Sequence, residues 1–151
     1  MYEAYWKLTS HPFSNAADPR YYYHSRQHDE ALVKLTYAAT ENMGAAVLTG
    51  PYGCGKTLLS RVFVQQLGHR IVPVLCSAQP AMAPLDLLRS IARSMSDAAL
   101  STIRTELMMD ALFERIEKCL TENARDGKHT IIVLDEAHMI DNQAVLETTR
   151  L

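Results

Sequence analysis

Apolar residues recur along much of the chain at the spacing of an amphipathic helix, three or four positions apart. The first such stretch follows Ser25, a residue type that commonly caps helices, and stops near Asn42 to Gly44. Helices are likewise predicted for Leu59 to Leu67 before Gly68, Pro84 to Met95, Met108 to Leu120 before Asp126-Gly127, and Asn142 to Leu151.

Other short runs are apolar at nearly every position, which is typical of strands that are buried on both faces. These runs are Ala45–Thr49, Ile71–Cys76 and Thr130–Leu134. Pro73 lacks the N–H group that a sheet ladder needs, so its strand is expected at a sheet edge. Because helices and strands alternate along the chain, the pattern predicts an α/β three-layer domain with a parallel sheet.

Residues 1–24 differ from the rest of the chain because they are rich in aromatic and turn-forming residues. We expect them to form an ordered linker wrapped on the domain that residues 25–151 make up. The aromatic side chains are expected mainly to pack, although a purine ring could also be held at this position before the first strand.

The composition indicates a globular chain of 151 residues, 48% of them hydrophobic, with a formal net charge of −2 and a pI near 6.3. The sequence shows no apolar stretch long enough to span a bilayer and no secretory signal. The three cysteines lack the spacing of a zinc site or a disulfide framework, which favours reduced thiols and a cytoplasmic location. The net charge provides no general basic field for nucleic acid, so such binding would need a local patch.

The strongest chemical signal is the octapeptide Gly50 to Thr57, which matches the phosphate-loop pattern G-x-x-x-x-G-K-[ST] between an apolar run and a helix. In such loops backbone N–H groups surround a phosphate, the lysine contacts its outer oxygens and the hydroxyl binds Mg²⁺. Lys56 and Thr57 are expected to have these two roles. The nucleotide-binding residues are expected to be Gly50, Pro51, Tyr52, Gly53, Cys54, Gly55, Lys56, Thr57 and Leu58.

A second signal follows the last apolar run, where Asp135 and Glu136 come directly after Leu134. The carboxyl ends of strands form the edge of an open α/β sheet where ligands bind. In a Walker-B strand the first acid, here Asp135, holds Mg²⁺ and the second, here Glu136, polarises the attacking water. His138 completes an Asp-Glu-Ala-His tetrapeptide that also occurs in RNA helicases, but nothing else in the sequence supports that class.

The N-terminal sequence adds to these general nucleotide motifs. The informative segments are Met1–Trp6, Pro12-Phe13, Asp18–Tyr23, His28–Leu32, Leu48–Gly50 and Asp135–Ala137. Together they resemble the ExeA-type AAA+ ATPases of general secretion, and similar ATPases assist pilus biogenesis or transposition. The resemblance implies an additional-strand (ASCE) P-loop ATPase that uses ATP and Mg²⁺, with sheet order 5-1-4-3-2.

That family also has a fourth and a fifth strand, an arginine finger and a helical lid, for which this sequence shows no counterpart. The domain is therefore expected to be truncated after the Walker-B strand and the following helix. The run Ala45–Thr49 would then lack both neighbouring strands, and each unpaired buried backbone group costs about 1–3 kcal/mol. We expect weak unfolding cooperativity and little turnover from these 151 residues alone.

Three classes of function remain open at this point. The resemblance favours an ATPase that remodels a secretion or pilus envelope complex, and it implies a homo-oligomer in the intact protein. A transposition helper that binds DNA in an ATP-dependent oligomer is the second class. The third is a nucleotide-binding fragment that does not hydrolyse ATP.

Overall fold

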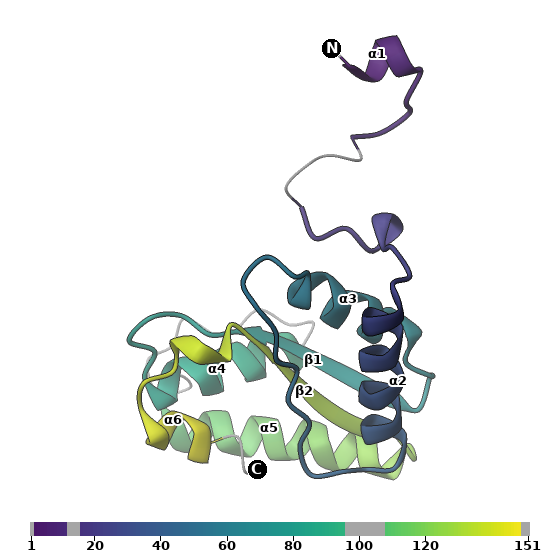
Figure 1. Ribbon diagram of the computed structural model, residues 1–151. Coiled ribbons are helices and arrows are strands. Elements are labelled where there is room, and N and C mark those ends of the chain that lie inside the picture. Colours follow the sequence, from purple (N-terminus) through teal and green to yellow (C-terminus); the bar gives the residue numbers. More distant parts are fainter. Residues whose placement is uncertain (1, 12–15, 96–107, 149–151) are drawn as a thin grey trace. The chain divides into compact units, whose positions relative to one another are not determined.

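The computed structural model describes residues 2–11, 16–95 and 108–148 (Figure 1). Contacts divide the chain into two compact units, an N-terminal unit of residues 1–66 and a C-terminal unit of residues 67–151. The boundary expected from the sequence between residues 24 and 25 lies inside the first of these units, and we describe each unit by itself.

The regular elements of the N-terminal unit, within the residues that the structure describes, are all helices. They are α1 (Tyr2–Trp6), the 3₁₀ helix η1 (Pro19–Tyr21), α2 (Arg26–Thr40) and α3 (Lys56–Gln66). The predicted cap of α2 is confirmed, because the Ser25 side chain accepts a hydrogen bond from the backbone N–H of His28. The buried side chains lie on one face of each long helix and are Leu32, Leu59, Val62 and Phe63.

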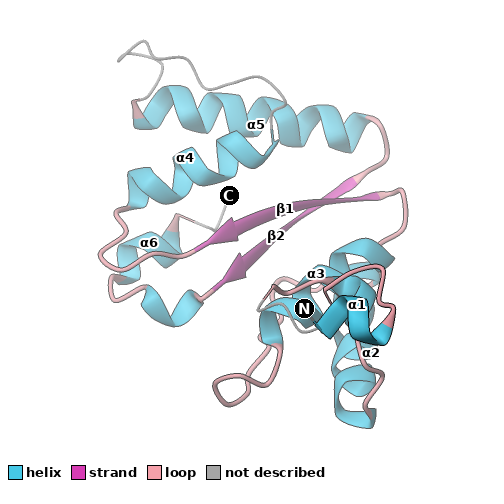
Figure 2. Cartoon of the chain, turned by 90° about the horizontal axis from the view of Figure 1, so that it is seen from above, coloured by secondary structure: helices cyan, strands magenta, loops and turns pink. Residues whose placement is uncertain are grey.

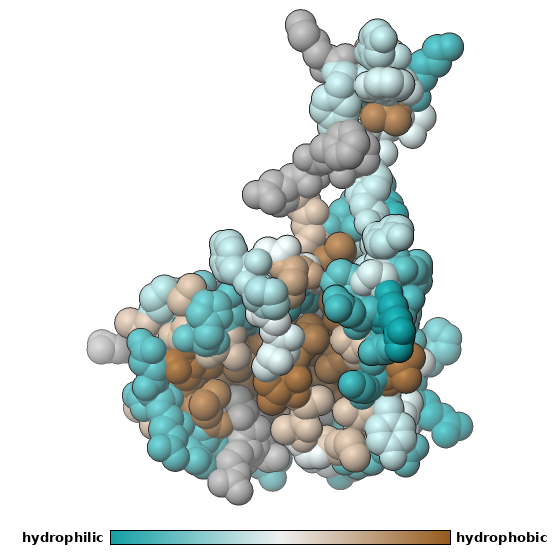
Figure 3. All heavy atoms as spheres, viewed as in Figure 1, coloured by the Kyte–Doolittle hydropathy of each residue, from teal (hydrophilic) through white to brown (hydrophobic). Residues whose placement is uncertain are grey.

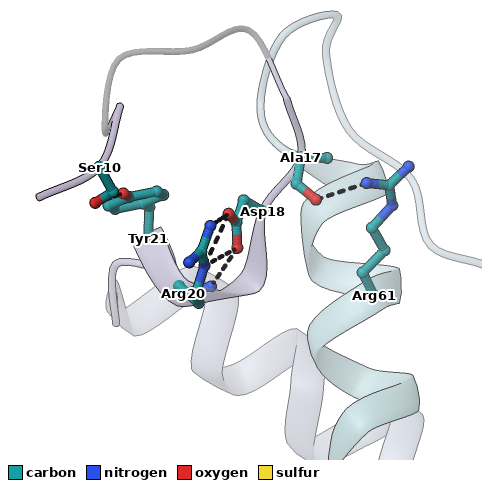
Figure 4. Close-up of polar contacts among 6 residues, drawn as sticks. All are labelled: Ser10, Ala17, Asp18, Arg20, Tyr21 and Arg61. Carbon is teal, nitrogen blue, oxygen red and sulfur yellow. Dashed lines mark hydrogen bonds and ion pairs between the residues drawn. The ribbon is translucent and has the colours of Figure 1, made fainter.

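Side-chain hydrogen bonds order the segment before α2 (Figure 4). Asp18 accepts hydrogen bonds from the backbone N–H and the guanidinium of Arg20, which closes the turn that η1 forms. Arg61 of α3 donates to the carbonyl oxygen of Ala17 at 2.7 Å, so this segment is attached to the helix that follows the phosphate loop.

The strand predicted for residues 45–49 does not form. These residues take no regular structure, and the Val47 side chain is 82% exposed. A strand exists only through ladder hydrogen bonds to a neighbour, and no strand in the described part of the chain pairs with this segment. The prediction of a strand for residues 45–49 was therefore wrong.

The C-terminal unit contains a parallel pair of strands, β1 (Ile71–Ser77) and β2 (His129–Asp135). Between them the chain forms α4 (Pro84–Met95) and α5 (Met109–Arg125), and Figure 2 shows both helices on one side of the strands. The 3₁₀ helix η3 (Ala137–Met139) and α6 (Gln143–Glu147) follow β2. The strands and helices predicted from Ile71 to Leu134 are thus confirmed. The strand ends lie within one residue of their predicted positions, and α5 continues past Leu120 to Arg125, directly before the predicted stop at Asp126-Gly127.

The core of this unit lies between one face of the two strands and the helices. Val74 and Cys76 of β1 belong to it, together with side chains of α4, α5 and α6. The register sets Pro73 opposite Ile131 and Leu75 opposite Val133 on the other face, where Leu75 is 44% exposed. Figure 3 shows further hydrophobic side chains on the viewed surface. The apolar run of β2 is therefore half-buried rather than fully buried within the described residues.

The parallel sheet with helices confirms the α/β class that the alternation of elements predicted. In the implied sheet order 5-1-4-3-2, β1 corresponds to strand 2 and β2 to the Walker-B strand 3. These two strands are neighbours in that order, which agrees with the observed pairing of β1 with β2 and with an edge position for Pro73. Helix α6 ends at Glu147, earlier than the predicted helix over residues 142–151, of which 149–151 lie outside the described residues. Within the described ranges, no helix is both long and apolar enough to cross a membrane.

Candidate nucleotide site

The phosphate-loop motif forms a turn that leads directly into helix α3. Gly53 and Gly55 have φ angles of 76° and 86°, in the left-handed region that glycine enters without steric cost. Helix α3 starts immediately afterwards, at Lys56. Gly50 is needed for a different reason, because a Cβ atom there would lie 2.8 Å from the Cys54 Sγ atom. The glycines of the motif therefore occupy positions where other residues would be strained or would clash.

A row of backbone donors is available where the loop meets the helix. Among the residues that the structure describes, none accepts a hydrogen bond from the backbone N–H groups of Gly53, Gly55, Lys56, Thr57 and Leu58. The first N–H groups of a helix have no partner within the helix, and the helix dipole adds partial positive charge there. Such an arrangement matches the oxygens of a phosphate, so the loop fits the group that the motif implies.

Lys56 bridges the two ends of this loop. Its Nζ atom donates hydrogen bonds to the carbonyl oxygens of Gly50 at 3.1 Å and Pro51 at 3.0 Å. These carbonyl oxygens are neutral, and a phosphate oxygen is a stronger acceptor for an ammonium group than either of them. Lys56 is therefore positioned inside the loop with a charge that an anion can use.

The remaining predicted residues differ in exposure. Thr57, Leu58 and Cys54 are half-buried, and Cys54 is a free thiol. Tyr52 is 99% exposed, so no other part of the described chain covers its side chain. Its contribution to phosphate binding, like that of Pro51, would come from the backbone shape of the loop.

One residue at the loop was not among those predicted from the motif. His28, in the first turn of α2, lies with its Nε2 atom 2.9 Å from the carbonyl oxygen of Cys54. Sequence spacing gives no sign of this contact, because the two residues are 26 positions apart. Only the inclusion of His28 in the N-terminal segment that resembles the ExeA type singled it out.

The two carboxylates lie at the carboxyl end of β2, as the sequence predicted. Asp135 is the last residue of the strand, and its Oδ1 atom accepts a hydrogen bond from the backbone N–H of Glu136 at 3.0 Å. Glu136 has a φ of 55°, a left-handed conformation that is uncommon for a residue with a side chain. Both residues are half-buried, which leaves the carboxylates accessible to a ligand.

His138 is close to the second carboxylate. Its Nδ1 atom lies 3.3 Å from Glu136 Oε2, and both side chains are substantially exposed, at 63% and 43%. The contact follows from the turn of η3, which returns His138 toward Glu136. An exposed pair of this kind is worth little energy but can orient the Glu136 carboxylate.

Within the described residues, no group of three or more His, Cys, Asp and Glu side chains could hold a metal ion by itself. Mg²⁺ usually takes one or two protein oxygens and completes its shell with phosphate and water. The predicted metal residues Thr57 and Asp135 lie in the N-terminal and C-terminal units respectively, and their joint role remains a prediction.

Comparison with known families agrees with this arrangement of motifs. The AAA domain profile matches residues 39–151, which include the whole phosphate loop and both carboxylates. The chain belongs to the AAA domain family. The P-loop NTPase fold class is thereby confirmed, and His28 lies outside the matched part of this AAA protein.

One similar protein aligns with the whole length of this AAA protein. General secretion pathway protein A of Aeromonas hydrophila is 34% identical over 152 aligned residues, which cover 100% of this chain. The chain spans 26% of the length of that relative. This similarity confirms the resemblance inferred from the N-terminal segments and the motifs. No solved structure gives a significant match.

Proposed function

We propose that this AAA domain binds ATP with Mg²⁺ and hydrolyses it. The observation that carries the proposal is the row of backbone N–H groups at the start of α3 that have no acceptor within the described residues, with the Lys56 ammonium held beside them in the loop. The preference for adenine as the nucleotide base is supported by the family rather than by the loop, because the loop would contact only the phosphate groups.

Each residue of the site has a distinct role in this proposal. Lys56 and the N–H groups of the loop stabilise the negative charge of the phosphates, which is the main source of catalysis in phosphoryl transfer. Thr57 and Asp135 would hold Mg²⁺, which when bound neutralises charge on the phosphate oxygens. Glu136 accepts a hydrogen bond from the attacking water and orients it.

The wider role is proposed to lie in secretion or envelope assembly. The 34% identical relative, General secretion pathway protein A, supports this role by its name. The net charge of −2 offers no general attraction for DNA, which makes a transposition helper the weaker alternative. We further propose a cytoplasmic location and a homo-oligomeric intact protein that acts on envelope proteins.

The proposal is tested by titrating the chain with Mg-ATP in a calorimeter and measuring phosphate release. Lys56→Ala should abolish binding, because it removes the charge inside the loop, whereas Lys34→Ala, a change at an exposed lysine of α2, should not. Glu136→Gln should retain binding and lose hydrolysis, with the exposed Glu117→Gln on α5 as its control.

These measurements separate the functional classes. Absence of Lys56-dependent binding would contradict the proposed function altogether. Binding without phosphate release would favour a nucleotide-binding fragment that does not hydrolyse ATP. DNA binding that appears on addition of ATP and weakens with salt would favour the transposition helper.

A further inference from the structure

We propose that His28 is a positioning residue that orients the peptide group between Cys54 and Gly55 and thereby directs the Gly55 N–H toward a bound phosphate. This inference rests on the proposed function, because it concerns how the loop binds its ligand. It assigns a role to a residue outside the matched AAA domain, which begins at residue 39.

The direction of the hydrogen bond follows from its acceptor. A carbonyl oxygen only accepts, so the Nε2 atom of His28 must carry the proton that it donates to Cys54 O at 2.9 Å. The other ring nitrogen, Nδ1, lies 2.9 Å from Ser25 Oγ, and the same Oγ accepts from the His28 backbone N–H. Ser25 therefore fixes the ring while it caps α2, and the ring holds the carbonyl group.

The covalent geometry of the peptide transmits this restraint to the phosphate loop. The C=O of Cys54 and the N–H of Gly55 belong to one planar peptide group, and the described chain contains no cis peptide bond. In a trans peptide the two groups point in opposite directions. A Cys54 carbonyl oxygen held toward His28 thus obliges the Gly55 N–H to face away from α2.

This peptide needs an external restraint because its neighbour is glycine. Gly55 has a φ of 86°, and glycine populates positive and negative φ about equally, so the peptide before it can rotate at little cost. The rotated form would aim the Cys54 carbonyl oxygen at the phosphate, where a donor is needed. Within the described residues His28 is the side chain that holds this carbonyl oxygen, so it selects the form that binds an anion.

Two substitutions separate the contact of the His28 ring with Cys54 from its contact with Ser25. In His28→Gln the side-chain amide nitrogen can reach the place of Nε2 and still donate to Cys54 O. In His28→Asn the shorter side chain can replace only Nδ1 and keeps the contact with Ser25. Gln27→Asn, at an exposed position in the same helical turn, controls for the effect of asparagine on α2.

The test measures the affinity of the 151-residue chain for Mg-ATP and for pyrophosphate by calorimetry. His28→Asn should weaken the binding of both ligands by at least about tenfold, because the Gly55 N–H would no longer donate to the charged phosphate. A hydrogen bond to a charged group is worth about 1.5–3 kcal/mol, and 1.4 kcal/mol is tenfold. His28→Gln should remain within about twofold of the unsubstituted chain, as should Gln27→Asn.

A second measurement follows the peptide itself and needs no ligand. The backbone amide resonance of Gly55 should keep its position in His28→Gln and should shift or broaden in His28→Asn, since rotation of the peptide changes the surroundings of that N–H. Equal affinities and unchanged Gly55 resonances in both variants would overturn the inference.

Other outcomes also decide the matter. A loss confined to Mg-ATP, with pyrophosphate unaffected, would indicate that His28 contacts the purine and would overturn the positioning role. If the unsubstituted chain bound neither ligand, the proposed function would fail, and the Gly55 resonance alone would then decide whether His28 orients the peptide.

Discussion

Gly55 of the phosphate loop and Glu136 after β2 both have left-handed backbone conformations, and only the glycine is well suited to this region. Gly55, at a φ of 86°, lacks the Cβ atom that makes this region costly. Glu136, at 55°, bears that cost at the end of β2, where its N–H contacts Asp135. Uncommon conformations of this kind are concentrated at functional sites. The motif predicted the glycine, but no local pattern predicted the conformation of Glu136.

At Gly55 we expect alanine to destabilise the chain by roughly 1–2 kcal/mol and to weaken phosphate binding, because a side chain disfavours the required φ. Space is not the cause, since a Cβ atom there would lie 3.8 Å from His28 Nε2, an ordinary contact. The matched control is Gly44→Ala, which introduces a Cβ atom into open space. Urea unfolding and calorimetry with Mg-ATP measure both effects, and equal behaviour of the two variants would contradict the expectation.

At the scale of elements, the C-terminal unit is held together by apolar contacts between α4, α5 and one face of β1 and β2. Leu87, Leu88 and Ile91 of α4 are fully buried, as are Leu112 and, within 1%, Ile116 of α5. Their helical spacing was visible in the sequence. The half-buried state of the opposite sheet face was not, because spacing along a strand does not show what covers each face.

Truncation of Ile116 to alanine is expected to lower the free energy of unfolding by about 2–5 kcal/mol, since it removes buried methyl groups and leaves a cavity. Its neighbour on α5, Glu117, is exposed, and Glu117→Ala should change stability by about 0.5 kcal/mol or less. Urea denaturation followed by circular dichroism compares the two variants. Similar destabilisation by both would show that Ile116 is not part of a packed core.

The thiol of Cys76 in β1 gives a prediction for pH. Burial raises the pKa of this thiol above its ordinary value of 9.0, although hydrogen bonds with Ser90 and Ser94 act in the opposite sense. A raised pKa means that the folded state binds the proton more tightly, so the associated stability is present below the ordinary pKa and is lost as pH rises through the folded value.

Accordingly, the free energy of unfolding should fall more steeply above pH 9.0 for the unsubstituted chain than for Cys76→Ala. Cys119→Ala is the control, because Cys119 is half-buried rather than buried. Urea denaturation across this pH range measures the slopes. Parallel slopes for the unsubstituted chain and Cys76→Ala would exclude a linked thiol.

At the scale of the whole molecule, the two chemical motifs lie in different units of one family domain. The phosphate loop belongs to residues 1–66 and the carboxylates to residues 67–151, while the AAA match extends from 39 to 151 and so includes both. Ligand binding is consequently a property to measure on the whole chain rather than on either unit.

Mg-ATP should stabilise the folded chain by mass action. At a free concentration of 100 times Kd, a ligand that binds only the folded state adds about 2.7 kcal/mol to the free energy of unfolding. Thermal unfolding with and without Mg-ATP measures the shift, with Lys56→Ala as the control that should show none. An equal shift in Lys56→Ala would assign the stabilisation to binding outside the phosphate loop.

The sequence by itself determined the α-helices from α2 onward, the two paired strands, the phosphate loop and the carboxylates at the end of β2, whereas α1 and the 3₁₀ helices were not predicted. Each of the predicted features depends on neighbours within a few positions: the spacing of apolar residues around a helix, the apolar run of a strand, or the glycines of a turn. The Ser25 cap was predictable for the same reason, because its partner is three residues away.

Only the tertiary structure decided the state of residues 45–49 and the contact between His28 and Cys54. A strand needs hydrogen bonds to a distant part of the chain, and an apolar run cannot show whether that partner is in place. The His28 contact likewise joins residues 26 positions apart on different elements. Such contacts depend on which distant segments the fold brings together, and the local spacing of residues does not predict that.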